Sequence, residues 1–242
     1  MRIAVLSDVH GNLPALDAVL AAVEDEGFDA VVSGGDVVTG PMPAACLERL
    51  ARLGDRVAWV RGNADREVLE LLAGTLEEDP HGPVARQAAW AAARLSAEDR
   101  ELLAAFAATV RLGEVLVCHG TPASDTGIVT PRARPRRLSA AVGDTDAAIV
   151  VGGHVHLQFV QRAGSVQWVN AGSVGMPYEG ASGAFWLAIV DGSIDLRRTA
   201  YDTAAAAAAI RATGYPDADD QIAAITGAIT REEAMDAFDP HP

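Results

Sequence analysis

The chain has 242 residues, of which 50% are hydrophobic and 21% charged, and its formal net charge is −14. These values indicate one folded domain with a sizeable core and exclude global disorder. The negative charge repels nucleic acid phosphates, so we expect no duplex DNA or RNA as a partner. A small anionic ligand stays compatible with it, because bound divalent ions reverse the potential of a site locally.

The two cysteines, Cys46 and Cys118, are too few for a disulfide framework and stand in no paired metal-binding spacing. A reducing compartment therefore fits the chain best. The N-terminal run MRIAVLSD reaches a polar residue too soon for a signal sequence or a membrane span. We expect a cytoplasmic protein with no membrane partner, and the sequence leaves a homo-oligomer open.

Short β-branched apolar runs alternate with helical patterns at the start of the chain, as is typical of helices that cover a sheet. Residues 2–6 predict the first strand. Asn12 can cap the next helix, which we expect to end near Gly27. The elements expected after it are a strand at 29–33, a helix at 44–53 and a strand at 56–60.

Residues 66–108 carry a mostly helical pattern, with Ser96 as a cap, and predict a helical insertion. The later strand signals are closely spaced and joined by short turns such as Asp191-Gly192, which favours antiparallel or mixed pairing. A helix at 203–212 and an acidic tail, which we expect to fray, complete the chain to residue 242. The later strands are expected at 114–118, 147–151, 159–161, 166–169, 184–190 and 194–199. The predicted fold class is α/β, a two-sheet β-sandwich flanked by helices.

Side chains that can bind metals stand in five Gly-containing turns, each directly after an apolar run. Parallel strands bring such turns together at the carboxyl edge of a sheet. Alone, an Asp or Asn there could simply cap a helix, and a His could be an ordinary interior residue. Together they predict a metal site. The segments are SDVHGN with Asp8 and His10, GGDVV with Asp36, RGNAD with Asn63, CHGTP with His119, and GGHVHLQ with His154 and His156.

This ordered pattern of Asp-x-His, Gly-Asp, Gly-Asn, His-Gly and Gly-His-x-His resembles the calcineurin-like metallophosphoesterases, in particular their compact prokaryotic branch. The resemblance covers about the first two thirds of the chain and implies an α-β-β-α layered fold with two divalent metal ions. Imidazole and carboxylate ligands suit Mn, our first choice, and also Fe, Zn, Ni or Mg. The ligands that the resemblance implies are Asp8, His10 and His156 for one metal, Asn63, His119 and His154 for the other, and Asp36 as the bridge.

Two ions about 3.5 to 4 Å apart lower the pKa of a bridging water, and the resulting hydroxide would attack phosphorus directly. Asp36, Asn63 and His119 are therefore also candidate catalytic residues. The implied substrate is a small organic phosphate, namely a phosphodiester, a nucleotide or a dinucleoside polyphosphate. The alternatives are a phosphoprotein phosphatase and, in another class, a non-catalytic scaffold or binding module on the same fold. The complete ligand set favours the enzyme.

The sequence departs from the family pattern at Ala64, where many members carry a His directly after the Gly-Asn pair. An alkyl side chain can neither steer a phosphate nor protonate a leaving group. The choice between diesters and monoesters therefore stays open, with Asp65, Arg61 or Arg66 as candidate substitutes.

Five further residues are candidates for substrate binding. Asn12 is either a helix cap alone or also a partner that orients the site. A basic island at residues 132–137 is either a solvated helix start or a loop that grips phosphate through its arginines. The candidates are Asn12, Arg61, Arg66, Arg132 and Arg134.

Overall fold

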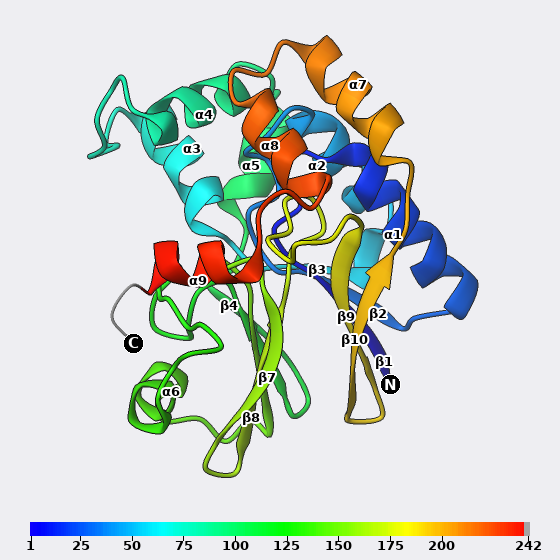
Figure 1. The fold of residues 1–242 in the computed structure, drawn as a ribbon, viewed down its shortest axis with the longest axis vertical. Helices are drawn as coiled ribbons and strands as arrows, with labels where there is room; N and C mark the ends of the chain where they lie inside the picture. The colour runs from blue at the N-terminus through cyan, green and yellow to red at the C-terminus, as the bar shows by residue number, and fades with distance from the viewer. Residues whose placement is uncertain (240–242) are drawn as a thin grey trace.

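Two five-stranded sheets pack face to face in the computed structural model, which describes residues 1–239 (Figure 1). The first sheet runs in the order β10 (Ser193–Thr199), β9 (Ala184–Val190), β1 (Arg2–Leu6), β2 (Ala30–Ser33) and β3 (Val57–Trp59). The second runs in the order β4 (Thr109–Leu112), β5 (Val115–Cys118), β6 (Ile149–Gly152), β8 (Val166–Ala171) and β7 (Gln158–Ala163).

Both sheets are mixed, as the sequence predicted for the later strands. In the first sheet β1, β2 and β3 are parallel, and in the second β5, β6 and β8 are parallel. The other strand pairs are antiparallel. Asp191 and Gly192 form the hairpin turn between β9 and β10, with φ values of 48° and 82°. Each sheet thus has one edge where the carboxyl ends of parallel strands meet.

Apolar residues fill three layers around the sheets. Side chains such as Val5 and Leu187 from the first sheet meet Val117 and Val151 from the second between the two sheets. Helices α1 (Leu13–Glu26) and α2 (Pro43–Ala51) pack on the outer face of the first sheet. Helix α6 (Pro135–Val142) covers the outer face of the second sheet, where Leu138 packs in one cluster with Trp168. The predicted sandwich with helices outside is therefore confirmed.

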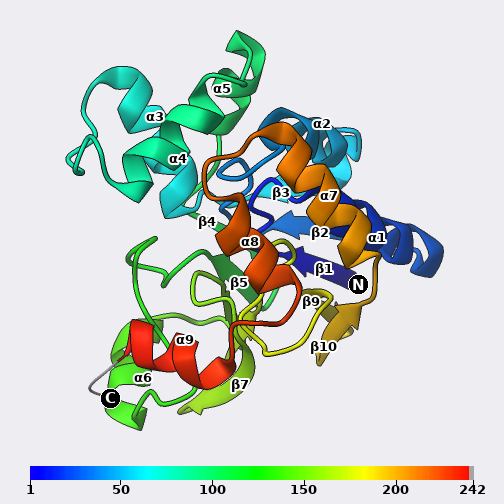
Figure 2. The same cartoon turned by 45° about the horizontal axis from the view of Figure 1, so that its top comes forward.

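The region 66–108, predicted to be mostly helical, contains most of three helices. Helices α3 (Asn63–Ala73), α4 (Pro83–Ala92) and α5 (Ala97–Ala104) lie together at one end of the sheets (Figures 1 and 2). Ser96 caps α5 as expected, because its Oγ accepts from the Asp99 amide at 3.1 Å.

The C-terminal region differs from the prediction. Helix α7 (Thr203–Thr213) occupies the predicted position, but two more helices, α8 (Ala218–Ile225) and α9 (Arg231–Phe238), follow where we expected a tail. Ile222 and Ile225 of α8 pack in a buried cluster with α7, so this stretch is folded. The expectation of a fraying tail is wrong up to residue 239, whose side chain is buried and pairs with Arg137, and residues 240–242 lie outside the described part of the chain. Within residues 1–239, no helix combines the length and the apolar character needed to cross a membrane.

Candidate metal centre

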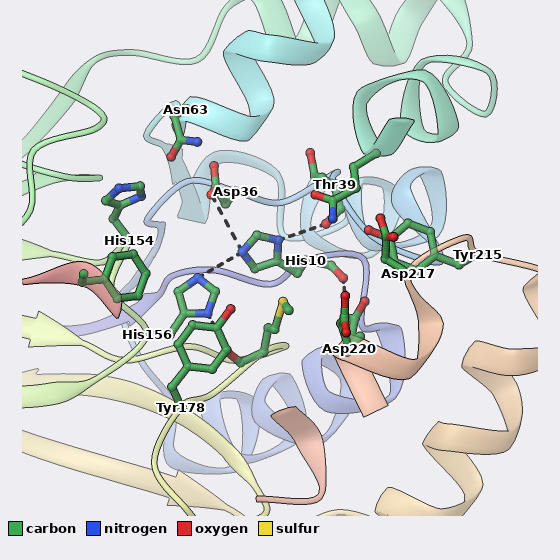
Figure 3. Close-up of a pocket in the computed structure, with 14 residues that line it drawn as sticks. His10, Asp36, Thr39, Asn63, His154, His156, Tyr178, Tyr215, Asp217 and Asp220 are labelled. Carbon is green, nitrogen blue, oxygen red and sulfur yellow. Dashed lines mark hydrogen bonds and ion pairs between the residues drawn. The ribbon is translucent and has the colours of Figure 1, made fainter. Parts of the chain in front are cut away.

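The seven predicted ligands all stand where parallel strands end. The turns follow β1, β2 and β3 in the first sheet and β5 and β6 in the second. Figure 3 shows His10, Asp36, Asn63, His154 and His156 around one common space. In chain order, the turns hold Asp8 with His10, Asp36, Asn63, His119, and His154 with His156.

The backbone at most of these residues is left-handed, a conformation that side-chain-bearing residues rarely adopt. The φ values are 56° at Asp8, 45° at His10, 54° at Asp36, 66° at His154 and 58° at His156. Among residues 1–239, Asp191 at the hairpin is the one other non-glycine residue with positive φ. Local backbone strain is thus concentrated at the candidate ligands, as is typical of functional sites.

Three donor groups form the first cluster. A nitrogen of His10, a nitrogen of His156 and an oxygen of Asp8 lie within 4.8 Å of one another. The Nε2 of His156 lies 3.2 Å from Asp8 Oδ1, and the Nε2 of His10 lies 3.9 Å from the same oxygen. These are the three residues predicted to share one metal.

The second cluster contains Asp36, His119 and His154, whose donor atoms also lie within 4.8 Å of one another. The Nε2 of His119 is 3.3 Å from Asp36 Oδ2 and 3.2 Å from the side-chain oxygen of Asn63. The same Oδ2 of Asp36 lies 3.8 Å from His10 Nε2 in the first cluster. Asp36 therefore stands between the two clusters, in the position predicted for a bridging ligand.

Three of the histidine rings are oriented by backbone carbonyl groups. The Nδ1 atoms of His10, His119 and His156 lie 3.0, 2.9 and 2.6 Å from the carbonyl oxygens of Thr39, Gly34 and Met176 respectively. A carbonyl can only accept, so each Nδ1 carries the proton and each Nε2 faces the interior of the site.

The facing nitrogens fit a bound cation. With the Nδ1 atoms protonated, the neutral rings of His10 and His156 point two lone pairs at each other across 3.2 Å. The buried Oδ1 of Asp8 has no hydrogen-bond partner within the described residues and lies beside them. Its Oδ2 accepts from Ser7 Oγ at 2.6 Å and from the His154 amide at 3.1 Å. A divalent ion would satisfy the unpaired oxygen and both nitrogens together.

The carboxylate of Asp36 is oriented in a similar way. Its Oδ1 accepts from the Ala64 amide at 2.8 Å, which leaves Oδ2 free to face the two clusters. Gly62 makes this arrangement possible, because a Cβ at that residue would lie 2.0 Å from Asp36 Oδ1. Asn63 is held by Glu67, whose Oε1 accepts from Asn63 Nδ2 at 3.1 Å, so that the amide oxygen points inward.

Charge interactions determine the protonation of the site without metal. Burial acts to raise the pKa of Asp8, but His156 and His119 outweigh it and lower that pKa to about 2. The same competition, with His119 as the main opposing group, holds the pKa of Asp36 well below its usual range. Burial acts to lower the pKa of His119, but Asp36 and Asp8 outweigh it and raise that pKa to about 10. At neutral pH His119 therefore carries a proton that a metal must displace.

We expect the affinity for Mn²⁺ to rise with pH. Because the pKa of His119 is about 10, binding near neutral pH must release its proton. The apparent affinity should then increase by up to about tenfold per pH unit for each proton released. Calorimetric titration in buffers of different ionisation enthalpy counts these protons directly. An affinity that is constant with pH, without proton release, would contradict this picture of the site.

Three of the candidate substrate residues belong to neither the donor clusters nor the lining of the cavity beside them. Asn12 is fully buried, and its Oδ1 caps α1 by accepting from the Ala15 amide at 3.2 Å. Arg61 and Arg66 line a separate cavity of about 320 Å³. Arg66 is also paired with Asp125 at 2.7 Å.

The basic island contacts the C-terminal helix. Arg132 pairs with Asp236 of α9, and Arg137 pairs with Asp239 at 2.7 Å. Arg134 is exposed at the start of α6. The basic island therefore leads into helix α6 and also holds α9 in place through ion pairs.

Asp65 cannot replace the missing histidine. Its side chain is fully buried, and its two oxygens accept from the amides of Asp36, Val37, Val38 and Gly62. Asp65 thereby holds the turn after β2 to the start of α3, and neither oxygen is available to a substrate.

Residues from the C-terminal half cover the site, and the motifs gave no indication of them. The ring of Tyr178 stacks on His156 at 4.5 Å, and Phe238 of α9 meets the His154 ring edge-on at 6.0 Å. Gln221 of α8 donates to the His10 carbonyl at 2.8 Å. These contacts leave a cavity of about 220 Å³ over the clusters.

Comparisons with known proteins indicate the family to which the chain belongs. Residues 1–193 match the calcineurin-like phosphoesterase superfamily domain. The phosphodiesterase YfcE of Escherichia coli K12 is 28% identical over 189 residues, which are 74% of this chain and 83% of that protein.

Two solved structures have the same fold. A metallophosphoesterase from Sphaerobacter thermophilus is 27% identical with a TM-score of 0.76, over 93% of this chain and 100% of that one. The hypothetical protein PH1004 of Pyrococcus horikoshii OT3 is 18% identical with the same TM-score of 0.76, over 93% and 97% of the two chains. The match to the family domain, together with the two potential metal sites, shows that the chain belongs to the calcineurin-like phosphoesterase superfamily and is a metal-dependent hydrolase of phosphate esters.

Proposed function

We propose that this protein is a dinuclear phosphodiesterase that hydrolyses small organic phosphodiesters. The observation that carries the proposal is the convergence of the two donor clusters beneath one small cavity. Asp8, His10 and His156 would hold one divalent ion, and Asn63, His119 and His154 the other, with Asp36 shared between them. Mn is the ion that we favour, because the ligands are imidazole, carboxylate and amide without thiolate.

Metals bound here would supply Lewis-acid charge and an activated water for attack at phosphorus. The contribution of the chain is to orient the ligands before substrate arrives. Carbonyl groups fix the imidazoles of His10, His119 and His156, and the Ala64 amide fixes Asp36. Such preorganisation means that little rearrangement is needed when charge develops in the transition state.

The size of the cavity, and the residues that cover it, favour a small substrate over a phosphoprotein. Tyr215, Phe238 and Gln221 line its C-terminal side, and its volume is about 220 Å³. A folded phosphoprotein needs an open groove beside the metals, whereas a small ester can enter a cavity of this kind.

The charge around the cavity supports a diester over a monoester. Asp217 and Asp220 line the wall away from the metal ligands, and a doubly charged monoester would be repelled by them more than a singly charged diester. Position 64 is a buried alanine, so the residue after Asn63 offers no proton to a leaving group. The two free, buried cysteines support a cytoplasmic location, which we retain as part of the proposal.

The test is hydrolysis of bis-p-nitrophenyl phosphate beside p-nitrophenyl phosphate, by metal-stripped protein reconstituted with Mn²⁺. We expect turnover only with metal and kcat/KM about fivefold or more in favour of the diester, since one repelled charge is worth about 1 kcal/mol or more in such a site. A faster monoester would overturn the diester assignment. No metal-dependent turnover of either ester would overturn the proposed activity.

A further inference from the structure

The cavity over the metal clusters has a second, chemically different end. Figure 3 shows Tyr215, Asp217 and Asp220 together on the side beyond His10, away from Asn63 and His154. These groups come from the start of α8 and the turn before it. This end of the cavity is therefore acidic and aromatic. Neither property helps to bind a phosphate group.

Asp217 has an unused carboxylate oxygen. Its side chain is 10% exposed, and its Oδ1 accepts from Arg86 at 2.6 Å. Its Oδ2 is buried and has no hydrogen-bond partner among residues 1–239. Asp217 stands at the N-cap of α8 but accepts no capping bond from that helix. Asp217 lines the cavity, so its carboxylate contributes negative charge to this end, which the pairing with Arg86 offsets in part.

Asp220 adds a second negative charge. It belongs to none of the ion pairs found in the described chain, and it lines the same cavity. Burial raises the pKa of the Tyr215 hydroxyl, and the Asp217 and Asp220 carboxylates add to this rise. The charge of Asp220 therefore acts on the aromatic hydroxyl at this end of the cavity.

We propose that the preferred substrate is a phosphodiester whose second alcohol carries an ammonium group, so that the cation occupies the end formed by Tyr215, Asp217 and Asp220. An ammonium group is attracted by both carboxylates and by the faces of aromatic rings, which favour organic cations. A second phosphate or a carboxylate at this end would be repelled. This inference rests on the proposed phosphodiesterase activity and specifies its substrate class.

The direct test compares p-nitrophenyl phosphorylcholine with p-nitrophenyl 3,3-dimethylbutyl phosphate, its uncharged carbon isostere. In both, a water oxygen bonds to phosphorus, the bond to p-nitrophenolate breaks with its electron pair, and the water proton passes to solvent. The two substrates therefore differ only in the charge of the second arm. We expect kcat/KM to be about tenfold higher for the choline ester, carried mainly by KM. Equal values would overturn the inference.

Substitutions of single carboxylates test which residues produce the preference for the choline ester. Asp220→Asn is expected to reduce the preference to about threefold or less, and Asp217→Asn to act in the same direction. Asp219→Asn is the matched control, because it removes the same charge from the neighbouring residue of α8, whose side chain is 95% exposed and faces Arg211. An equal loss in the control would show a long-range charge effect and overturn the assignment to this end of the cavity.

A binding measurement separates this inference from the proposed activity. Calorimetric titration of the Mn-loaded protein with phosphocholine and with 3,3-dimethylbutyl phosphate needs no turnover. Tighter binding of phosphocholine, lost in Asp220→Asn, would support the cation site even in a protein that hydrolyses no diester. Equal affinities in a protein that hydrolyses bis-p-nitrophenyl phosphate would overturn the cation site and leave the phosphodiesterase intact.

Discussion

Asp36→Ala is expected to lower kcat by about a thousandfold or more and to reduce the metal content of the protein, while the domain stays folded. The reason is the position of Asp36 Oδ2, which lies 3.3 Å from His119 Nε2 and 3.8 Å from His10 Nε2. One substitution therefore removes a ligand from both donor clusters. Turnover of bis-p-nitrophenyl phosphate and metal analysis after dialysis measure the two effects.

The exposed Asp55→Ala is the control for loss of a carboxylate, and circular dichroism verifies the fold of both variants. Turnover at the rate of the unchanged protein in Asp36→Ala would contradict the shared role of this residue. Normal metal content with no turnover would instead restrict Asp36 to the chemical step.

Gly62→Ala is expected to disrupt the site without touching a ligand. The added Cβ would lie 2.0 Å from Asp36 Oδ1 and 2.4 Å from the Asp36 amide nitrogen, so the turn after β2 must move. We expect a loss of about 2 to 3 kcal/mol in the free energy of unfolding, as for other overpacked positions, and activity below about 1%. Chemical denaturation and the diester assay measure these quantities.

Gly82→Ala is a matched control, since both glycines are N-caps with nearly the same backbone. The φ and ψ angles are −84° and 169° at Gly62 and −71° and 170° at Gly82. At Gly82 the nearest atom to an added Cβ is 3.1 Å away. Its effect should stay within about 0.5 kcal/mol. Similar losses in both variants would show that glycine flexibility, and not the contact with Asp36, is what matters at Gly62.

The candidate ligands could be proposed from sequence because each of them is local to a motif. A strand followed by a Gly-containing turn places a side chain at the carboxyl edge of the sheet, and several such turns in one order identify the family. Asp8 and His154 come from different sheets, yet both positions follow from this one rule. The sandwich and the helices of the region 66–108 could also be predicted, because the periodicity of their apolar residues is local in the sequence.

The residues that cover the site could not be predicted, because their positions depend on contacts between segments that are distant in the sequence. Gln221 reaches the His10 carbonyl across 211 residues, and no local pattern encodes such a pairing. The acidic composition after residue 212 also concealed two short helices. The arginine island likewise looked free in sequence, while in the structure Asp236 of α9 pairs with Arg132, and Asp239 at the C-cap of that helix pairs with Arg137.

The left-handed backbone of the ligand residues affects how this protein can change over time. A non-glycine residue held in that conformation costs about 1 to 2 kcal/mol, and five of the seven candidate ligands have positive φ. Replacing one of these five by glycine removes a candidate metal ligand and also relieves strain. Loss of catalysis through such substitutions therefore need not destabilise the fold, which gives an inactive descendant a physical route to persist as a binding protein.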